Sequence, residues 1–312
     1  MKITVLIPTY NRSAILSMTL KGLAKQTFPL SDFEVIVVND GSADDTEAVL
    51  KKFKKGPLNL TFITQENAGQ GNARNHGLKF AKGEIVLMLG DDMIPSHTLL
   101  EEHWNSHQKS GISAVLGLIE WHPELEVNPF MEWMTNGSSI LGKFGGHQFA
   151  FEKLDRGHQP DFNFFYTSNL SVQRELLGTQ PFDPIFTKYG WEDIELGYRL
   201  QKENNMKMAY NAKAITYHYH PMDEDSLGRR MEMIGRSAHI IDGKHPELKK
   251  VPTLWKKSAL WALSNPLSLS GIKWANSLSR GKLQPLYYYA QSKKHFLRGV
   301  KSGYTEHHEK NA

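Results

Sequence analysis

Residues 3–12 read ITVLIPTYNR, and this stretch decides the fold class. Its first five residues form a β-branched, apolar run that is typical of a buried strand, and the run ends directly in a proline and polar residues. Residues 13–26 then place apolar side chains at helical spacing, with Ser13 in a capping position. The stretch therefore predicts a strand followed by a covering helix, which is the first part of a βαβ unit.

The same pattern repeats through the first hundred residues. Further strands are predicted at residues 34–38, 60–63 and 85–89, and further helices at 44–53 and 69–81. Such alternation indicates an α/β fold with a mostly parallel sheet flanked by helices. Beyond it we expect a helix at 96–108, a strand at 113–119, an irregular functional loop at 123–157, a strand at 167–172, a helix at 191–203 and a strand at 214–220.

The composition restricts the class of protein and the chemistry. With 40% hydrophobic and 22% charged residues, the chain is expected to be a soluble globular protein. No apolar run approaches the roughly 18 residues of a membrane-spanning helix. The N-terminus favours a first strand over a secretion signal, so we expect a cytoplasmic location. The chain has no cysteine, which leaves oxygen and imidazole ligands for a metal, as Mg²⁺ or Mn²⁺ prefer.

Chemically reactive side chains follow four successive predicted strands. Because ligands of parallel sheets bind at the carboxyl ends of the strands, these side chains are expected to share one site. Any single segment also fits an ordinary turn, and Asp-Gly-Ser is a common turn signal. The four segments are Pro8-Thr9-Tyr10-Asn11-Arg12, Asn39-Asp40-Gly41-Ser42, Glu66-Asn67-Ala68-Gly69 and Gly90-Asp91-Asp92.

Two pairs of neighbouring carboxylates stand out. Asp91 and Asp92 follow the apolar run 85–89, where like charges need a cation or hydrogen-bond donors nearby. The pair fits a divalent metal site, or an exposed capping pair before the next helix. Glu192 and Asp193 begin a predicted helix, where the helix dipole favours acidic residues. A carboxylate held at such a position beside a pocket is also well placed as a general base.

Taken together, these segments resemble a family 2 glycosyltransferase of GT-A fold. The resemblance runs from about residue 2 to residue 220 and includes Ala73, Arg74 and Gly77 after the third strand. It implies that the first half binds a nucleotide-diphosphate sugar, with Asp40 bonded to the base, often uracil. It further implies donor contacts from these residues: Pro8, Thr9, Tyr10, Arg12, Asn67, Gly69, Arg74, Asp91 and Asn169.

The resemblance also implies a metal and a catalytic base. The family's acidic motif is Asp-x-Asp, and here Gly90 stands at its first position. Asp92 would then hold Mn²⁺ or Mg²⁺ together with His218, with His220 as the alternative. Asp193, beside Glu192, would take the proton from an acceptor hydroxyl, with inversion at the sugar carbon. The Gln-x-x-Arg-Trp motif of processive members is absent, so we expect single sugar additions.

The charge changes along the chain. Residues 244–312 contain 13 Lys or Arg and 3 Asp or Glu, although the net charge of the whole chain is only +4. We therefore expect a GT-A domain at 1–243, with a nucleotide-binding half at 1–95 and an acceptor-side half at 96–243, and a basic, aromatic helical extension at 244–312. The extension fits a peripheral membrane contact at the inner face of the cell membrane, a helical subdomain or a homodimer contact.

The acceptor and the rival functions are less constrained by the residues. A soluble saccharide, a glycolipid and a protein acceptor all fit the motifs, and we expect a cell-surface glycan, a glycolipid or a polysaccharide precursor. The acidic body disfavours nucleic acid. A dinucleotide-dependent oxidoreductase would require Gly-x-Gly-x-x-Gly after the first strand, and residues 8–12 contain no glycine. A non-catalytic nucleotide-sugar-binding module remains an alternative, because Gly90 replaces an expected Asp.

Overall fold

The computed structural model describes residues 1–137, 151–155, 157–187 and 189–309. The chain divides into two compact units. Unit 1 contains Met1–Leu125, Phe151–Thr187 and Glu192–His220, and unit 2 contains Glu126–Ala150, Lys188–Trp191 and Pro221–Ala312. We expected a boundary at residue 243, but α9 (Glu224–Lys244) groups with the helices that follow it.

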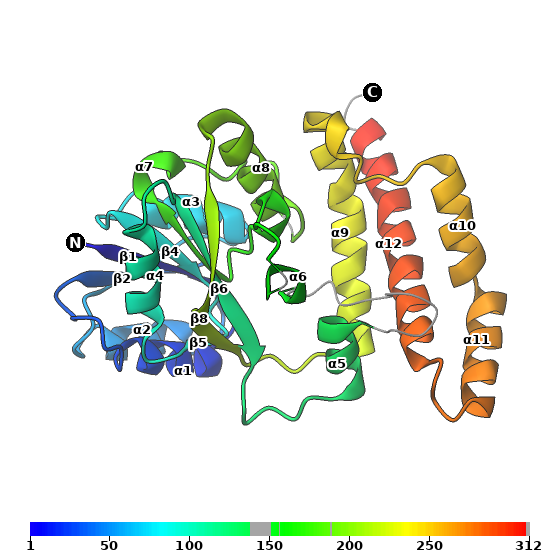
Figure 1. The fold of residues 1–312 in the computed structure, drawn as a ribbon, viewed down its shortest axis with the longest axis horizontal. Coiled ribbons are helices and arrows are strands. Elements are labelled where there is room, and N and C mark those ends of the chain that lie inside the picture. Colours follow the sequence, from blue (N-terminus) through cyan, green and yellow to red (C-terminus); the bar gives the residue numbers. More distant parts are fainter. Residues whose placement is uncertain (138–150, 156, 188, 310–312) are drawn as a thin grey trace. The chain divides into compact units, whose positions relative to one another are not determined.

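Unit 1 is built on a mixed sheet, which in the described residues has eight strands in the order β3-β2-β1-β4-β7-β6-β8-β5 (Figure 1). The first four strands in this order are mutually parallel, and β7 joins them antiparallel to β4. The strands are β1 (Ile3–Thr9), β2 (Phe33–Asn39), β3 (Leu60–Thr64), β4 (Ile85–Leu89), β5 (Met93–Pro95), β6 (Ala114–Trp121), β7 (Asn169–Gln173) and β8 (Met208–His218).

Helices cover both faces of this sheet. α1 and α2 lie on one face and α3 lies on the other, as right-handed crossovers require when the strand order reverses after β3 (Figure 1). The helical elements of unit 1 are α1 (Ser13–Leu23), α2 (Thr46–Phe53), α3 (Gln70–Leu78), α4 (Leu99–His107), α6 (Glu152–Asp155), α7 (Arg174–Leu177), α8 (Glu192–Asn204) and the 3₁₀ turn η1 (Phe162–Phe164).

The central strands are buried along their whole length, as expected for a parallel sheet covered on both faces. The one buried charge in β2, Glu34, accepts hydrogen bonds from Thr4 Oγ1 and from the backbone N–H of Lys82, each at 2.7 Å. Thr4 Oγ1 in turn accepts from Gly83 N at 2.9 Å. Glu34 thereby links β1, β2 and the loop before β4 at the amino ends of these strands, opposite the carboxyl ends.

Several elements differ from the sequence-based expectation. The strand predicted at 214–220 begins earlier and ends earlier, as β8 (Met208–His218), and the short β5 was not predicted. The region 123–157, predicted to be irregular, contains α5 (Pro129–Asn136) and α6. Asn128 caps α5 by accepting from Met131 N at 2.9 Å, with Pro129 at its first position. Residues 138–150 and 156 of that region lie outside the described residues.

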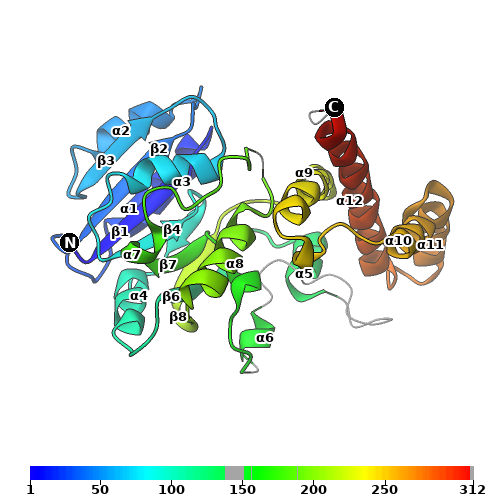
Figure 2. The same cartoon turned by 90° about the horizontal axis from the view of Figure 1, so that it is seen from above.

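Unit 2 is helical in its described residues. Besides α5 and α9 it contains η2 (Pro246–Leu248), α10 (Leu254–Ser264), α11 (Pro266–Leu278) and α12 (Gln284–Glu309). α12 lies between α9 on one side and the α10–α11 pair on the other (Figure 2). No helix in the described part of the chain is both long enough and apolar enough to cross a membrane.

Glycines set the spacing of α9 and α12. A Cβ at Gly299 would lie 2.1 Å from the backbone oxygen of Glu232, and one at Gly235 would lie 2.2 Å from that of Phe296. Two helix backbones come this close only where one of them lacks a side chain.

Candidate active site

The carboxyl ends of β1, β2, β3 and β4 meet at one edge of the sheet, because these four strands are parallel. Thr9, at the end of β1, donates a hydrogen bond of 2.8 Å from Oγ1 to Asp91 Oδ2, just after β4. Thr19 of α1 donates to the backbone oxygen of Asp91 at 2.8 Å. The topology thus brings together the side chains that the sequence placed at separate strand ends.

Asp40, which follows β2, organises the loop that leads into α3. Its carboxylate accepts from Gln65 Nε2 at 2.8 Å, from Ala68 N at 2.9 Å and from Gly69 N at 3.0 Å, and its backbone oxygen accepts from Asn67 Nδ2 at 3.1 Å. Gly69 has a φ of 90°, and a Cβ there would lie 2.5 Å from the backbone oxygen of Thr187. Three of about four acceptor positions of the carboxylate are used, which leaves one for a ligand.

Arg12 forms ion pairs with both carboxylates of the buried pair Asp91 and Asp92. Arg12 Nη1 contacts Asp91 Oδ1 at 3.1 Å and makes a close ion pair with Asp92 Oδ2. Burial and the charge of Asp92 raise the pKa of Asp91 to about 6, although Arg12 opposes the shift. Burial would also raise the pKa of Asp92, but His218, Arg12 and His220 outweigh it and hold this pKa well below its usual range. The two neighbouring carboxyls are therefore strongly unequal.

His218 ends β8 and faces Asp92. Its Nε2 lies 3.3 Å from Asp92 Oδ2, because β8 pairs with β5 and the pairing sets His218 opposite Met93. The ring stacks on Trp121 with centroids 5.2 Å apart and on His220 with centroids 5.8 Å apart. The rings of His218 and His220 lie on the same side of the chain, as the alternation of side chains along a strand predicted. Trp121, at the end of β6, was not predicted, although the rule for strand ends would have pointed to it.

A carboxylate and an imidazole nitrogen at this spacing form a donor set that Mn²⁺ accepts. Within the described ranges, no group of three or more His, Cys, Asp or Glu side chains is arranged to hold a metal ion. Asp92 and His218 therefore fit a divalent ion as two protein ligands, with the remaining positions left for water or for ligand oxygens.

The second acidic pair begins α8. Glu192 Oε1 accepts a close hydrogen bond from Gln70 Nε2, which comes from the first turn of α3. Asp193 Oδ1 accepts from Ile194 N at 2.8 Å. Burial and the charge of Glu192 raise the pKa of Asp193 to about 7, against the opposing charge of Arg74. Such a carboxyl is poised to exchange a proton near neutral pH.

Arg74 is the most unusual side chain of the site. It is 2% exposed, and its Nε and Nη1 have no hydrogen-bond partner in the part of the chain that the structure describes. Nη2 reaches only the backbone oxygen of Thr167, at 3.5 Å, and the guanidinium lies 5.6 Å from the ring of Phe182. Burial lowers its pKa, while the charges of Glu192, Asp193 and Asp91 act in the opposite direction.

An orphaned guanidinium in the protein interior is costly, since buried charges are normally paired and hydrogen-bonded. The structure therefore retains two donor groups of Arg74 that an anionic ligand would satisfy, and a guanidinium matches phosphate oxygens in geometry and charge.

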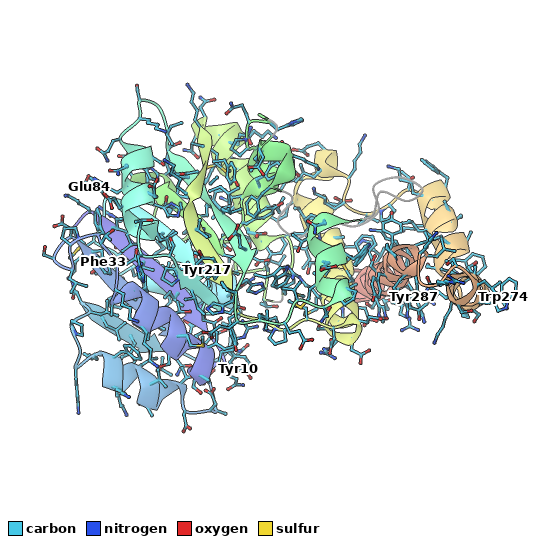
Figure 3. The ribbon with its side chains drawn as sticks, turned by 60° about the horizontal axis from the view of Figure 1, so that its bottom comes forward. Tyr10, Phe33, Glu84, Tyr217, Trp274 and Tyr287 are labelled. Carbon is cyan, nitrogen blue, oxygen red and sulfur yellow. The ribbon has the colours of Figure 1, made fainter. Side chains whose placement is uncertain are left out.

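Two predicted donor contacts have different surroundings. Asn169 is fully buried, donates from Nδ2 to the backbone oxygens of Leu118 and Ala214 at 3.0 and 2.9 Å, and pairs through Oδ1 with His103 Nε2 at 2.9 Å. Its amide is thus used in joining β7 to neighbouring segments, and we assign it a structural role instead of a sugar contact. Tyr10, by contrast, is 49% exposed and projects from the end of β1 (Figure 3). Pro8 is buried.

The fold and this site define the class of protein. A sheet that is parallel through β3-β2-β1-β4, with acidic residues and histidine at the strand ends, is the GT-A arrangement of glycosyltransferases. Residues 4–172 match the profile of glycosyl transferase family 2, and the chain belongs to this family. The predicted family and fold are thereby confirmed.

Similar proteins include a glucosyltransferase and a polysaccharide synthase, in agreement with the family. Validoxylamine A glucosyltransferase of Streptomyces hygroscopicus is 29% identical over 285 residues, which cover 84% of this chain and 64% of the relative. Chondroitin synthase of Escherichia coli is 28% identical over 267 residues, covering 78% and 38%. The chain thus spans less than two thirds of the length of these relatives.

Solved structures show the same fold. The mannosyltransferase PcManGT from Pyrobaculum calidifontis, in complex with GDP-Man and Mn²⁺, has a TM-score of 0.66 at 18% identity, covering 98% of this chain and 87% of that one. Residues 1–349 of TarS from S. aureus, in complex with UDP-GlcNAc, have a TM-score of 0.54 at 19% identity, covering 98% and 92%.

Proposed function

We propose that the protein transfers one sugar from a nucleotide-diphosphate sugar to an acceptor hydroxyl, with inversion at the anomeric carbon. The proposed donor is a UDP-sugar. The observation that carries the proposal is the buried Arg74, whose Nε and Nη1 lack partners within the described residues. A diphosphate supplies the anionic oxygens that these donors need. Family membership and the solved neighbours with UDP-GlcNAc or GDP-Man support a nucleotide sugar as the ligand.

The donor would bind along the strand ends. Asp40 has an acceptor position for the nucleobase, and the exposed ring of Tyr10 offers a stacking surface beside it. Asp91, with a pKa raised to about 6, would accept from the ribose when ionised. Arg12 now pairs with both aspartates, so donor binding must compete with or rearrange this ion pair.

A divalent ion fits the same edge of the sheet. Asp92 and His218 would hold Mn²⁺ or Mg²⁺, with His220 stacked behind His218 as the alternative ligand. When bound, the ion would neutralise charge on the departing diphosphate. The solved structures of PcManGT and of glucosyl-3-phosphoglycerate synthase from Mycobacterium tuberculosis are complexes with Mn²⁺, which supports this choice.

The catalytic step follows from Asp193. Its carboxylate would take the proton of the acceptor hydroxyl while the acceptor oxygen bonds to the anomeric carbon and the bond from that carbon to the phosphate oxygen breaks. The electron pair of the broken bond leaves with the diphosphate, beside Arg74. Attack opposite the leaving group inverts the anomeric centre, so no sugar–enzyme bond is formed. Glu192, held by Gln70, keeps the pKa of Asp193 high enough for this proton transfer.

The acceptor is proposed to be a saccharide, a glycolipid or another precursor of a cell-surface polysaccharide. The names of two relatives, chondroitin synthase and poly(ribitol-phosphate) beta-glucosyltransferase, are consistent with a polymer or glycan acceptor. Single additions are proposed because the motif of processive members is absent from the sequence.

A panel of nucleotide sugars tests the proposal. Donor hydrolysis and thermal shift are measured with and without Mn²⁺, alone and with candidate saccharide acceptors. We expect one donor to be turned over in a metal-dependent reaction, and Arg74→Met to weaken its binding by at least about tenfold. Arg174→Met is the matched control, because Arg174 donates to the backbone oxygen of Gly83, at the opposite ends of the strands.

Two results would contradict the proposal in different ways. If no nucleotide or nucleotide sugar shifts the melting temperature, the donor site is misassigned. If a nucleotide sugar binds but no donor is turned over with any acceptor tested, the chain is a binding module and the transferase proposal fails.

A further inference from the structure

Unit 2 carries an exposed apolar surface that the proposed transferase site does not use. Six large side chains of α10 and α11 are 63–86% exposed. We define the α10–α11 face by these six residues: Leu254, Trp255, Trp261, Leu267, Trp274 and Leu278.

The side chains occupy the outer sides of two neighbouring helices. On α11, Leu267, Trp274 and Leu278 recur with Gly271 at the spacing i, i+4, i+7 and i+11, which makes one continuous stripe. Leu269, the buried residue of α11, lies on the opposite side. Figure 3 shows Trp274 at the outer edge of α11, away from Tyr287 of α12. Both helices thus turn a polar or mixed side inward and an aromatic side outward.

The outer side of α10 is free of charge. Leu254, Ser258, Trp261 and Ala262 are all exposed on it, whereas Lys257 lies beside this stripe and Lys256 is exposed on the opposite side of the helix. Lys256 Nζ lies 5.7 Å from the ring of Trp255, so the ammonium borders the aromatic surface.

The charged residues of α10, α11 and the turn after them are all basic, and Lys273 acts on the carboxyl of Glu224, at the start of α9. Residues 248–305 contain 11 Lys or Arg and no Asp or Glu. Five of these basic residues fall between positions 254 and 282, on α10, α11 and the turn after them. A second copy of this chain docked face to face would therefore bring the two sets of basic side chains of α10 and α11 together. Like charges at such a contact are repulsive, which disfavours a symmetric dimer through this face.

An anionic lipid surface complements both the exposed apolar side chains of the α10–α11 face and the basic residues around it. Trp and Leu side chains partition into the boundary between headgroups and acyl chains, while lysines at their margins meet anionic headgroups. The lengths of 11 and 13 residues suit helices that lie in the plane of the interface and do not cross it.

We propose that the α10–α11 face binds the surface of an anionic bilayer, with Trp255, Trp261 and Trp274 inserted at the headgroup level. The proposal is independent of the transferase assignment, since none of its residues belongs to the active site.

Vesicle flotation with the full chain tests the proposal. Vesicles of phosphatidylcholine alone are compared with vesicles that also contain phosphatidylglycerol, at low and at raised salt. We expect binding to the anionic vesicles at least about tenfold tighter than to the neutral ones, and weaker at raised salt. The double variant Trp255→Ser/Trp274→Ser is expected to lose binding at least about tenfold. Because both side chains are exposed, the melting temperature should change little.

Matched variants separate the face from general effects. Lys256→Glu/Lys273→Glu should also lose binding to anionic vesicles, whereas Lys25→Glu/Lys79→Glu, with the same change of net charge on exposed sites of unit 1, should retain it. Phe80→Ser, an exposed aromatic of unit 1, controls for the tryptophan changes. The proposal is overturned if the wild type does not float with anionic vesicles, or if the control variants lose binding equally. A dimer that the tryptophan variants dissociate, without any vesicle binding, would assign the face to a second copy.

Discussion

The two acidic pairs of the active site have the same charge but opposite surroundings. Asp92 faces Arg12 and His218, and these neighbours hold its pKa well below the usual range despite burial. At Asp193, burial and the charge of the neighbouring Glu192 raise the pKa to about 7, although the backbone N–H of Ile194 and the charge of Arg74 oppose the shift. A pair of carboxyls driven apart in this way is typical of sites where one stays ionised and the other exchanges a proton.

The difference explains how one sheet edge combines two kinds of chemistry. A carboxylate that stays ionised suits a metal ligand, because a divalent ion binds the charged form. A carboxyl with a pKa near neutrality suits a general base. The environment of each pair, and not its sequence, is thus the basis of its proposed role.

The largest expected effect is that of Asp193→Asn. Because the amide cannot accept the proton, we expect the kcat of transfer to fall by about 10³-fold, while the Kd of the donor changes less than about threefold. Single-turnover kinetics and donor titration measure the two quantities separately. An equal loss in donor affinity would show that Asp193 contacts the donor and does not serve as the base.

Asp92→Asn is expected to act on the other pair. Loss of one ligand should weaken Mn²⁺-dependent donor binding and lower turnover by about 10²-fold. Titration of Mn²⁺ into the nucleotide-bound protein, followed by activity, measures the effect. Asp32→Asn is the matched control, because Asp32 pairs with Lys2 away from the strand ends. A variant with unchanged metal dependence would remove Asp92 from the metal site.

The pH dependence of turnover is expected to follow Asp193. With a pKa near 7, the ionised base is lost as the pH falls, so kcat should drop about tenfold per pH unit below that value. Glu192→Gln removes the like charge and should move this limb down by about one pH unit. Arg74→Met removes the opposing cation and should move it up. Shifts in the same direction for both variants would contradict the charge arrangement described here.

The smallest expected effect is on stability. Because the pKa of Asp193 is raised in the folded protein, the folded state binds the proton more tightly than the unfolded state does. Its contribution to stability is therefore present at acidic pH, below the unfolded value near 4, and is lost as the pH rises through about 7. Asp193→Asn should be more stable than the wild type by about 1–2 kcal/mol at pH 8 and equally stable near pH 4. Urea unfolding at both pH values measures this difference.

The sequence predicted the parts of the fold that have a strong local pattern. Residues 3–7 and 85–89 are apolar, β-branched runs bounded by polar residues. The first run falls within β1 and the second forms β4. α5 was missed because an irregular composition surrounds it, although Asn128 and Pro129 are a start signal. β5 has three residues, too few for a period, and forms because β8 offers it a partner.

The sequence indicated candidate site residues but not the contacts that they make. Parallel strand ends and the family resemblance brought out Asp40, Asp92 and Asp193. Nothing in the local pattern indicated that Arg12 would bridge Asp91 and Asp92, because this contact depends on the order of β1 and β4 in the sheet. The same reason hid the structural role of Asn169, whose amide meets segments that lie 45 and 51 residues away in the chain.

Calorimetric titration of UDP in the presence and absence of Mn²⁺ tests the central claim most directly, on the wild type, Asp92→Asn and Asp193→Asn. The separate roles of the two pairs predict that Mn²⁺ tightens UDP binding in the wild type and in Asp193→Asn, and that this gain is lost in Asp92→Asn. Loss of the gain in Asp193→Asn, or its persistence in Asp92→Asn, would contradict the assignment of the metal to one acidic pair and of the proton to the other.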